Sequence, residues 1–233
     1  MIKKLLFILL LWSNYSFGQF SVNKAFYSVE SSDATGLAGF GAFSAKTLTA
    51  NKLYISINVM GNTNNTPTYT STSLTWNTLI DYSDGTRRIF IIYCMPTATV
   101  NNEDLTIFRV GNSISGFCRG TWEFSGVPTG SNGANAIEYS ATNSGTSADP
   151  SVTLSSFKNS FVGSVFSNNA TPFSGTEESG WTEDFDDDGD TNGFYVMSRS
   201  NTVDNTPTVT SASSTWIGAA FVIRQLRRLT LID

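Results

Sequence analysis

The feature that most constrains this chain is a twelve-residue stretch that occurs twice in nearly the same form. Residues 65–76 read NTPTYTSTSLTW and residues 205–216 read NTPTVTSASSTW, so nine of the twelve positions are identical. Thr and Val favour strands because their branched side chains restrict χ1 and fit a pleated surface. Pro is tolerated at the entry or edge of a strand, where no ladder N–H is needed. The pair therefore predicts β structure with internal similarity.

Two explanations of this repeat remain open. One is the duplication of a half-sandwich. The other is that equivalent edge positions of a single sandwich select the same Thr-rich strand that opens with Pro. The 128 residues between the two copies contain no other clear correspondence, whereas repeat architectures show sustained self-similarity. The second explanation is therefore favoured.

The remaining pattern predicts short strands throughout. Leu53, Ile55, Ile57 and Val59 alternate with polar residues, which indicates a strand with one buried face. Residues 87–95 are apolar at both odd and even positions and predict a central strand covered on both sides, joined to 76–82 by a turn at Asp84-Gly85. Further strands are expected at 105–110, 120–127, 136–141, 151–154, 161–166, 193–198, 206–211 and 215–224.

No sustained helical periodicity accompanies these strands, and only residues 155–160 have the composition of a helical turn. Short strands at this spacing, separated by turn residues, predict an all-β fold. The expected architecture is a two-sheet antiparallel β-sandwich of jelly-roll type.

The N-terminus has the pattern of a secretory signal. Lys3 and Lys4 precede an apolar run from Leu5 to Trp12, and small residues at Ser16 and Gly18 suit a cleavage site. The run is shorter than the roughly 20 residues of a membrane helix, so removal is favoured over a retained anchor. We therefore expect a signal peptide at 1–18, a single domain at 19–233, export to the periplasm, outer surface or medium, and no membrane insertion after cleavage.

Composition narrows the partners. The net charge is −5 and the pI is about 4.7, which argues against nucleic acid because phosphate binding needs clustered Lys and Arg. The basic cluster at 224–228 is interpreted as a solvated tail. Only 14% of residues are charged while 13% are aromatic, a mixture typical of extracellular β proteins and unlike that of disordered chains.

Cys94 and Cys118 are the two cysteines of the chain. Export to an oxidising compartment would permit a disulfide between them. A bridge requires Cα atoms within about 7 Å of each other. Two buried thiols are the alternative, and the sequence leaves the choice open.

An acidic motif at 184–193, DFDDDGDTNG, is the sharpest local signal. Carboxylates at alternate positions followed by Gly suit a hard cation such as Ca²⁺, because several oxygens then converge within one loop. The candidate ligands are Asp184, Asp186, Asp188 and Asp190. Position twelve of a full EF-hand loop would be Tyr195 instead of Glu, so a solvated acidic turn is the alternative.

The chain contains no histidine. This excludes Ser-His-Asp and Cys-His catalytic systems and zinc sites that depend on His ligands. The remaining enzymatic option is carboxylate chemistry, such as a glycoside hydrolase or lyase, for which Glu123 and Glu138, on neighbouring candidate strands, form a candidate pair. We therefore expect a protein that is not an enzyme.

Aromatic rings offer another route to sugar recognition, because a flat ring stacks on the apolar face of a pyranose. Trp181 is the best candidate for an exposed platform, since it follows Gly180 and precedes the acidic motif. Tyr195 and Trp122 are further candidates. Each of these rings also suits a sandwich core, which is the competing interpretation.

Several segments resemble a known group of domains: the TPT strand ending at Leu74-Thr-Trp76, the turn at 85–88, the segment WEFSG at 122–126 and the closing strand at 214–223. Together they resemble the lectin-like, concanavalin A-like jelly-roll domains of secreted Bacteroidetes-type proteins and of phage tail or fibre proteins. The resemblance covers roughly residues 50–224. It implies a jelly-roll fold and a binding or architectural role, and no catalytic residue set accompanies it.

The favoured hypothesis is a secreted, non-catalytic recognition module for a glycan or cell-surface polymer, with a loop stiffened by Ca²⁺. The second hypothesis is an architectural subunit of a surface layer, filament or phage particle that associates with copies of itself through exposed strand edges. The third is a carbohydrate-active enzyme that uses carboxylates.

Overall fold

The computed structural model describes residues 19–30, 39–61, 66–108, 117–155, 157–168, 173, 175–187 and 193–226. The expected signal peptide at 1–18 lies outside these ranges. The strands of the N-terminal half are β1 (Ser21–Glu30), β2 (Gly39–Leu48), β3 (Leu53–Gly61), β4 (Thr68–Ser71), β5 (Asn77–Ser83), β6 (Arg87–Cys94), β7 (Val100–Phe108) and β8 (Phe117–Ser125). After the short 3₁₀ helix η1 (Ser131–Ala136) come β9 (Ile137–Ser147), β10 (Ser160–Asn168), β11 (Thr176–Glu177), β12 (Thr182–Asp187), β13 (Gly193–Thr202), β14 (Val209–Thr210) and β15 (Ser214–Ile223).

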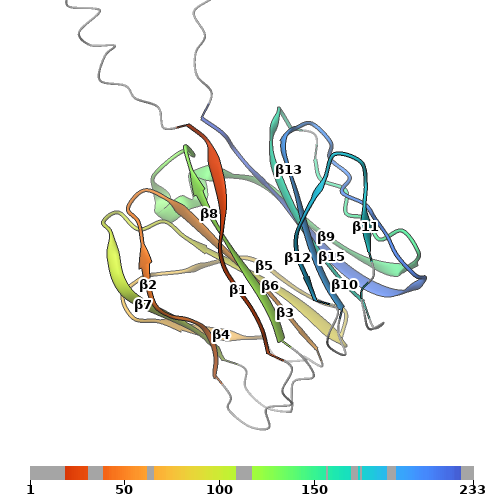
Figure 1. Cartoon of the computed structure of the whole chain (residues 1–233), viewed down its shortest axis with the longest axis horizontal. Coiled ribbons are helices and arrows are strands. Elements are labelled where there is room, and N and C mark those ends of the chain that lie inside the picture. The colour runs from red at the N-terminus through yellow and green to blue at the C-terminus, as the bar shows by residue number, and fades with distance from the viewer. Residues whose placement is uncertain are drawn as a thin grey trace, which may run out of the picture.

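Two five-stranded antiparallel sheets form the body of the protein (Figure 1). The N-terminal sheet has the order β1-β8-β3-β6-β5, and the C-terminal sheet has the order β12-β13-β10-β15-β9. They face each other across a central core built from the inward residues of both, including Trp122, Phe161 and Phe221. The all-β, two-sheet antiparallel sandwich expected from the sequence is confirmed.

Each main sheet is also covered on its outer face. The outer sheet β2-β7-β4 lies over the N-terminal sheet and encloses a second core that contains Tyr54, Trp76 and Phe90. The short pair β11-β14 lies over the C-terminal sheet and encloses a third core that contains Tyr195 and Trp216. The molecule therefore has four layers, which follow one another across the view of Figure 1.

This layering changes the interpretation of β3. Its alternating pattern predicts one buried and one exposed face, yet every residue from Leu53 to Gly61 is buried. The odd positions enter the central core, while Tyr54 and Met60 enter the core beneath the outer sheet. The prediction of a solvent-exposed face was wrong because periodicity reports which face is more polar, and a second layer can cover a polar face. The strand expected at 87–95 is found as β6, between β3 and β5.

The two halves of the chain share one topology. Each strand of the N-terminal sheet has a counterpart at the same place in the C-terminal sheet. β1 corresponds to β9, β8 to β15, β3 to β10, β6 to β13 and β5 to β12. The outer layers agree as well. β7 corresponds to β14 and β4 to β11, while β2 corresponds to the segment at Ser151, which pairs with Thr208 just before β14. A jelly roll is built from two Greek keys. In this chain the five strands of the N-terminal main sheet all come before the five strands of the C-terminal main sheet, so each half of the chain forms one main sheet.

The repeated twelve-residue stretch does not mark this duplication. Its first copy forms β4, and its second copy forms β14, which is the counterpart of β7. The counterpart of Trp76 is instead Trp181: each precedes the first strand of a hairpin by one residue, and each hairpin has a bulge followed by an inward residue, Ile80 or Phe185. The preferred explanation, equivalent edge positions of one sandwich, was therefore wrong, since β4 and β14 are non-equivalent strands of the outer layers and the second copy also enters β15 of a main sheet.

The central core depends on a close approach between Trp122 and the middle of the C-terminal sheet. Trp122 contacts Phe161 and Phe221 edge-on, with ring centroids 5.6 Å apart in both cases. A Cβ atom at Gly163 of β10 would lie 2.6 Å from the Trp122 ring and 2.8 Å from the Phe221 ring. Glycine at this position is therefore required by packing, because any side chain would push the two sheets apart.

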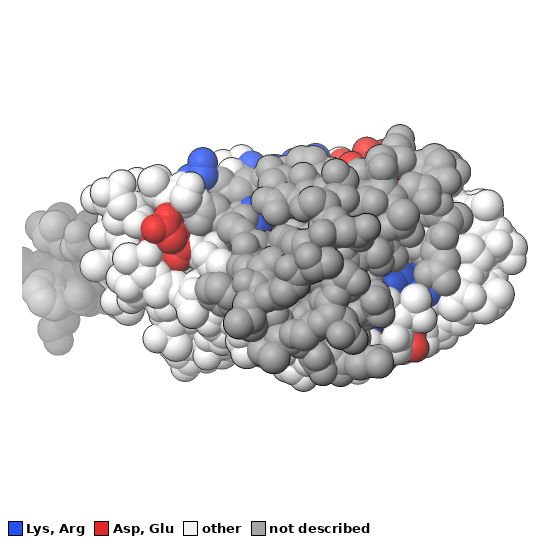
Figure 2. Space-filling model, turned by 90° about the horizontal axis from the view of Figure 1, so that it is seen from below, with Lys and Arg blue, Asp and Glu red and all other residues white. Residues whose placement is uncertain are grey.

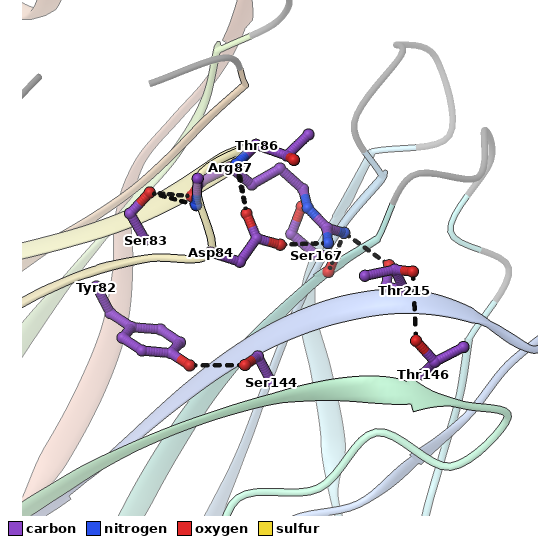
Figure 3. A network of polar contacts seen from close by, with 10 residues as sticks. Tyr82, Ser83, Asp84, Thr86, Arg87, Ser144, Thr146, Ser167 and Thr215 are labelled. Atoms are coloured by element: carbon purple, nitrogen blue, oxygen red, sulfur yellow. Dashed lines mark hydrogen bonds and ion pairs between the residues drawn. The ribbon is translucent and has the colours of Figure 1, made fainter. Parts of the chain in front are cut away.

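A buried arginine also joins the two main sheets, beside the turn between β5 and β6 (Figure 3). Arg87 of β6 donates to the carbonyl oxygens of Ser167 and Thr215 in the C-terminal sheet, at 2.9 and 2.8 Å. Its guanidinium also pairs with Asp84 at 2.6 Å. Burial alone would raise the pKa of Asp84, but bonds from the turn amides and from Arg87 outweigh burial and lower it. The turn that the sequence predicted at Asp84-Gly85 thus anchors one sheet to the other.

The substitution Gly163→Ala is expected to destabilise the protein by about 2 kcal/mol, within the usual cost of overpacking a filled core. Urea unfolding monitored by tryptophan fluorescence would measure this loss. Gly145→Ala is a matched control on β9, where the added Cβ would approach Trp216 no closer than 3.2 Å. A loss for Gly163→Ala no larger than that of the control would contradict this packing account.

Arg87→Met is expected to lower the free energy of unfolding by about 3 kcal/mol, because removing one partner of a buried pair leaves Asp84 Oδ2 and two carbonyl oxygens without the guanidinium donor. Chemical denaturation would measure the change. Arg199→Met is the control, since its pair with Asp204 has side chains 33% and 26% exposed and exposed pairs contribute about 1 kcal/mol or less. Equal losses in the two variants would show that Arg87 does not join the sheets energetically.

Candidate functional site

The acidic motif lies mostly on a strand and not in an open loop. Asp184 and Asp186 belong to β12, the edge strand of the C-terminal sheet, which pairs with β13. Asp188 and Asp190 lie outside the described residues. The pair formed by Asp187 and Phe194 closes the described end of this hairpin. The sequence did not predict β12, because carboxylates are uncommon in strands and the motif resembled a cation loop.

Asp184 occupies the bulge of β12 and turns towards the other main sheet. Its carboxylate pairs with Lys24 of β1 at 3.2 Å, and Lys24 also donates to the Glu183 carbonyl oxygen at 3.2 Å. Burial raises the pKa of Asp184, although the bond from Ser198 and the charge of Lys24 act in the opposite direction. The ionised carboxylate therefore has a free-energy cost in this position.

Asp186 lies opposite Tyr195 of β13. The Tyr195 hydroxyl donates to Glu177 Oε2 at 2.7 Å. Burial is the largest cause that raises the pKa of Tyr195. The hydrogen bond to Glu177 is the next largest, and the negative charges of Glu183 and Asp186 raise the pKa further. Glu177, Glu183 and Asp186 therefore form an acidic edge, a name used below for these three residues, around one buried phenol.

The equivalent hairpin of the N-terminal half shows how the fold neutralises acids when it uses them structurally. Its pair Tyr82–Ile89 corresponds to Asp187–Phe194, with seven residues of separation in each hairpin. There, Asp81 forms an ion pair with Arg88 and Asp84 forms one with Arg87. Among the described residues, Glu177 and Glu183 of the acidic edge form no such pair with Lys or Arg.

The described residues contain no group of three or more acidic or Cys side chains arranged to hold a metal ion. Of the four proposed Ca²⁺ ligands, Asp184 faces Lys24 and Asp186 faces the Tyr195 side of β13. The structure therefore does not bring these two carboxylates together. The placement of Asp188 and Asp190 is outside the described residues.

The three aromatic residues expected to stack on sugars are buried. Trp181 is 6% exposed, and its indole N–H donates to Asp204 at 3.1 Å. Tyr195 is 0% exposed and stacks on Phe173, while Trp122 is 1% exposed in the central core. The ligand-platform prediction for these residues was wrong, because their rings fill the cores between layers that the sequence alone could not count.

Cys94 and Cys118 are both buried thiols, so the disulfide alternative was wrong. Cys94 lies opposite Tyr54 and Cys118 lies opposite Val59, on the two sides of β3. Five residues along a strand correspond to about 16 Å, well beyond the reach of a disulfide. Their side chains also enter different cores. Burial and the nearby Glu103 carboxylate raise the pKa of Cys94, which keeps this thiol neutral.

Glu123 and Glu138, the proposed catalytic pair, belong to different sheets. Glu123 of β8 forms an ion pair with Lys52 and accepts a hydrogen bond from the Tyr54 hydroxyl at 2.7 Å. Its neighbours Trp122 and Phe124 point into the central core, so Glu123 faces the opposite side of the sheet. Glu138 lies on β9, at the edge of the C-terminal sheet. The two carboxylates therefore do not face each other across a sugar site.

Few large apolar side chains are exposed among the described residues. On the face shown in Figure 2, the described surface is largely uncharged, and acidic and basic side chains occur in small separate groups. The large apolar side chains that are exposed among the described residues are Tyr139, at 38%, and Val203. No helix in the described part of the chain has the length and apolar character needed to cross a membrane.

Comparisons with protein-family models, with curated proteins and with solved structures found no match for this chain. The resemblance to lectin-like jelly-roll domains therefore remains a prediction from the sequence.

The position of Asp184 predicts a specific pH dependence. Because its folded pKa lies above the unfolded value near 3.8, its carboxylate binds more protons in the folded state, and stability falls as the pH rises through the interval between the two values. Asp184→Asn removes this ionisation. The variant is expected to be more stable than the wild type at pH 7, with a difference that disappears below about pH 4. Urea denaturation across pH 3.5–8 would measure it, and a variant less stable than the wild type at pH 7 would contradict it.

Proposed function

We propose that this protein is an exported, non-catalytic recognition module for a glycan or cell-surface polymer, and that it contacts its ligand at the acidic edge beside the β12–β13 turn. The observation that supports this most is the concentration of carboxylates around Tyr195. In the equivalent N-terminal hairpin each acid has its own arginine. Glu177 and Glu183 have no such ion pair among the described residues. Carboxylates without a basic partner raise the local concentration of cations and attract hydroxyl-rich ligands through them.

The non-catalytic part of the proposal rests on how the described carboxylates are used. Glu103 is fully buried and accepts hydrogen bonds from Ser71 and Ser73. Asp204 accepts from Trp181 and Arg199. Each of these acids holds one segment against another. With no histidine in the sequence and the pair Glu123–Glu138 divided between sheets, no set of residues for acid–base catalysis is favoured.

Calcium is part of the proposal, as a cation that joins the acidic turn to hydroxyl or carboxylate groups of the polymer. Asp186, Asp188 and Asp190 are the ligands that the sequence offers there, with Asp184 turned away towards Lys24. Ca²⁺ takes six to eight oxygen ligands, so ligand hydroxyls and water would complete the coordination.

Calcium at about 100 times its Kd is expected to stabilise the protein by about 2.7 kcal/mol, since it binds only the folded state. For a chain of this size that corresponds to a rise in Tm of roughly 5–10 °C. Differential scanning calorimetry with and without Ca²⁺ would measure the rise, and Asp186→Asn is expected to abolish most of it. Binding to immobilised polysaccharides and glycan arrays should weaken when the cation is chelated.

The matched control is Asp81→Asn, at the position of the N-terminal hairpin that is equivalent to Asp186. This variant loses the ion pair with Arg88 and is therefore less stable, but its rise in Tm on adding Ca²⁺ should equal that of the wild type. A wild-type Tm that does not respond to Ca²⁺, together with the absence of glycan retention, would contradict the proposed function.

A further inference from the structure

Strand β9 differs from the other three outer strands of the main sheets. Those three carry charges or bulges that discourage pairing with another chain: Lys24 and a bulge on β1, Asp81 and a bulge on β5, and several acids on β12. Along β9, residues 139–147 have neither charge nor Pro. β9 has its charge, Glu138, and its bulge only at the first residues of the strand, so the edge from 139 to 147 lacks the features with which natural sheets avoid edge-to-edge contact.

The free side of β9 also presents its backbone. Among the described strands, β9 pairs with β15 on one side only. The Ser144 amide donates to its neighbour Asn143 at 2.9 Å, so this amide points away from β15. Because amide direction alternates along a strand, the amides of Ser140, Thr142 and Thr146 point the same way. Residues 142–144 are exposed.

One register brings complementary side chains together. An antiparallel pairing of two copies of β9 about a two-fold axis at Thr142 aligns residues 139–145, which stop short of the bulge at Glu138, and places Tyr139 of one copy opposite Gly145 of the other. Tyr139 is exposed, and at Gly145 the Trp216 ring already lies 3.2 Å from the position of a Cβ. This register therefore brings the Tyr139 side chain of one copy towards the Trp216 ring of the other, and aromatic pairs across strands stabilise a sheet.

We propose that two copies of this protein associate through β9, so that their C-terminal sheets join into one continuous ten-stranded sheet. The axis at Thr142 makes the contact isologous, and an isologous contact closes at a dimer and does not propagate into a filament. The dimer would present two acidic edges, but its formation needs no calcium. The inference therefore goes beyond the proposed function and can fail or succeed independently of it.

Sedimentation velocity over a wide concentration range tests the association directly. The wild type is expected to pass from a monomer, whose mass is 25.3 kDa for the full chain, to a species of twice the monomer mass. Thr142→Lys places two like charges opposite each other at the axis and should weaken the dimer about tenfold or more, as should Tyr139→Ser if the register is correct. Thr78→Lys, the same change on the exposed edge of β5, should leave the dimer unchanged.

Cross-linking tests the register. Thr142→Cys should form a covalent dimer under oxidising conditions, because the two residues at the axis lie about 5.5 Å apart in a hydrogen-bonded pair. Cys94 and Cys118 are buried and should not compete, and Thr78→Cys is the matched control. A wild type that stays monomeric, equal effects of Thr142→Lys and Thr78→Lys, or a wild-type dimer in which Thr142→Cys does not cross-link would each overturn the proposal.

Discussion

The burial of both main sheets on both faces is the constraint on which the rest of this structure depends. A two-layer sandwich would leave one face of each sheet in water, but here the outer sheet and the β11–β14 pair cover those faces and create two further cores. Large aromatic residues are therefore needed in three places, and the chain uses Trp76, Trp122 and Trp181 to fill them. Rings that would otherwise bind a ligand at the surface are used inside the molecule.

The same layering assigns roles to the scarce charges. Arg87 is inside the protein because it joins the turn at Asp84 to carbonyl oxygens of the other main sheet. Lys24 reaches from β1 to Asp184 of β12, the adjacent edge strand of the other main sheet. With most acids engaged in such contacts, the acidic edge around Tyr195 and the uncharged stretch 139–147 of β9 are the two surfaces whose composition the fold itself does not explain. The binding site and the dimer contact proposed above would account for them separately.

The duplicated topology was hidden from sequence comparison within the chain. Identity between residues 65–76 and 205–216 suggests one alignment, but strand order and bulge position give another, in which Trp76 corresponds to Trp181 and Asp81 to Asp186. The physical reason is that strands are specified by alternation and by a few inward residues, so many sequences fit one position. Thr-rich segments with an opening Pro suit any short covering strand, and they occur here at two different ones.

The sequence by itself determined the class of fold, the central strand β6, the hairpin turn at Asp84-Gly85 and the absence of imidazole chemistry, because these follow from residue type and period over a few neighbouring positions. Only the tertiary structure decided that Cys94 and Cys118 lie on opposite faces of one sheet, that Glu123 and Glu138 belong to different sheets, and that Trp181 is buried. These outcomes depend on how many layers stack and in what order. Side-chain period shows that a face is apolar, but the element that covers it comes from a distant part of the chain.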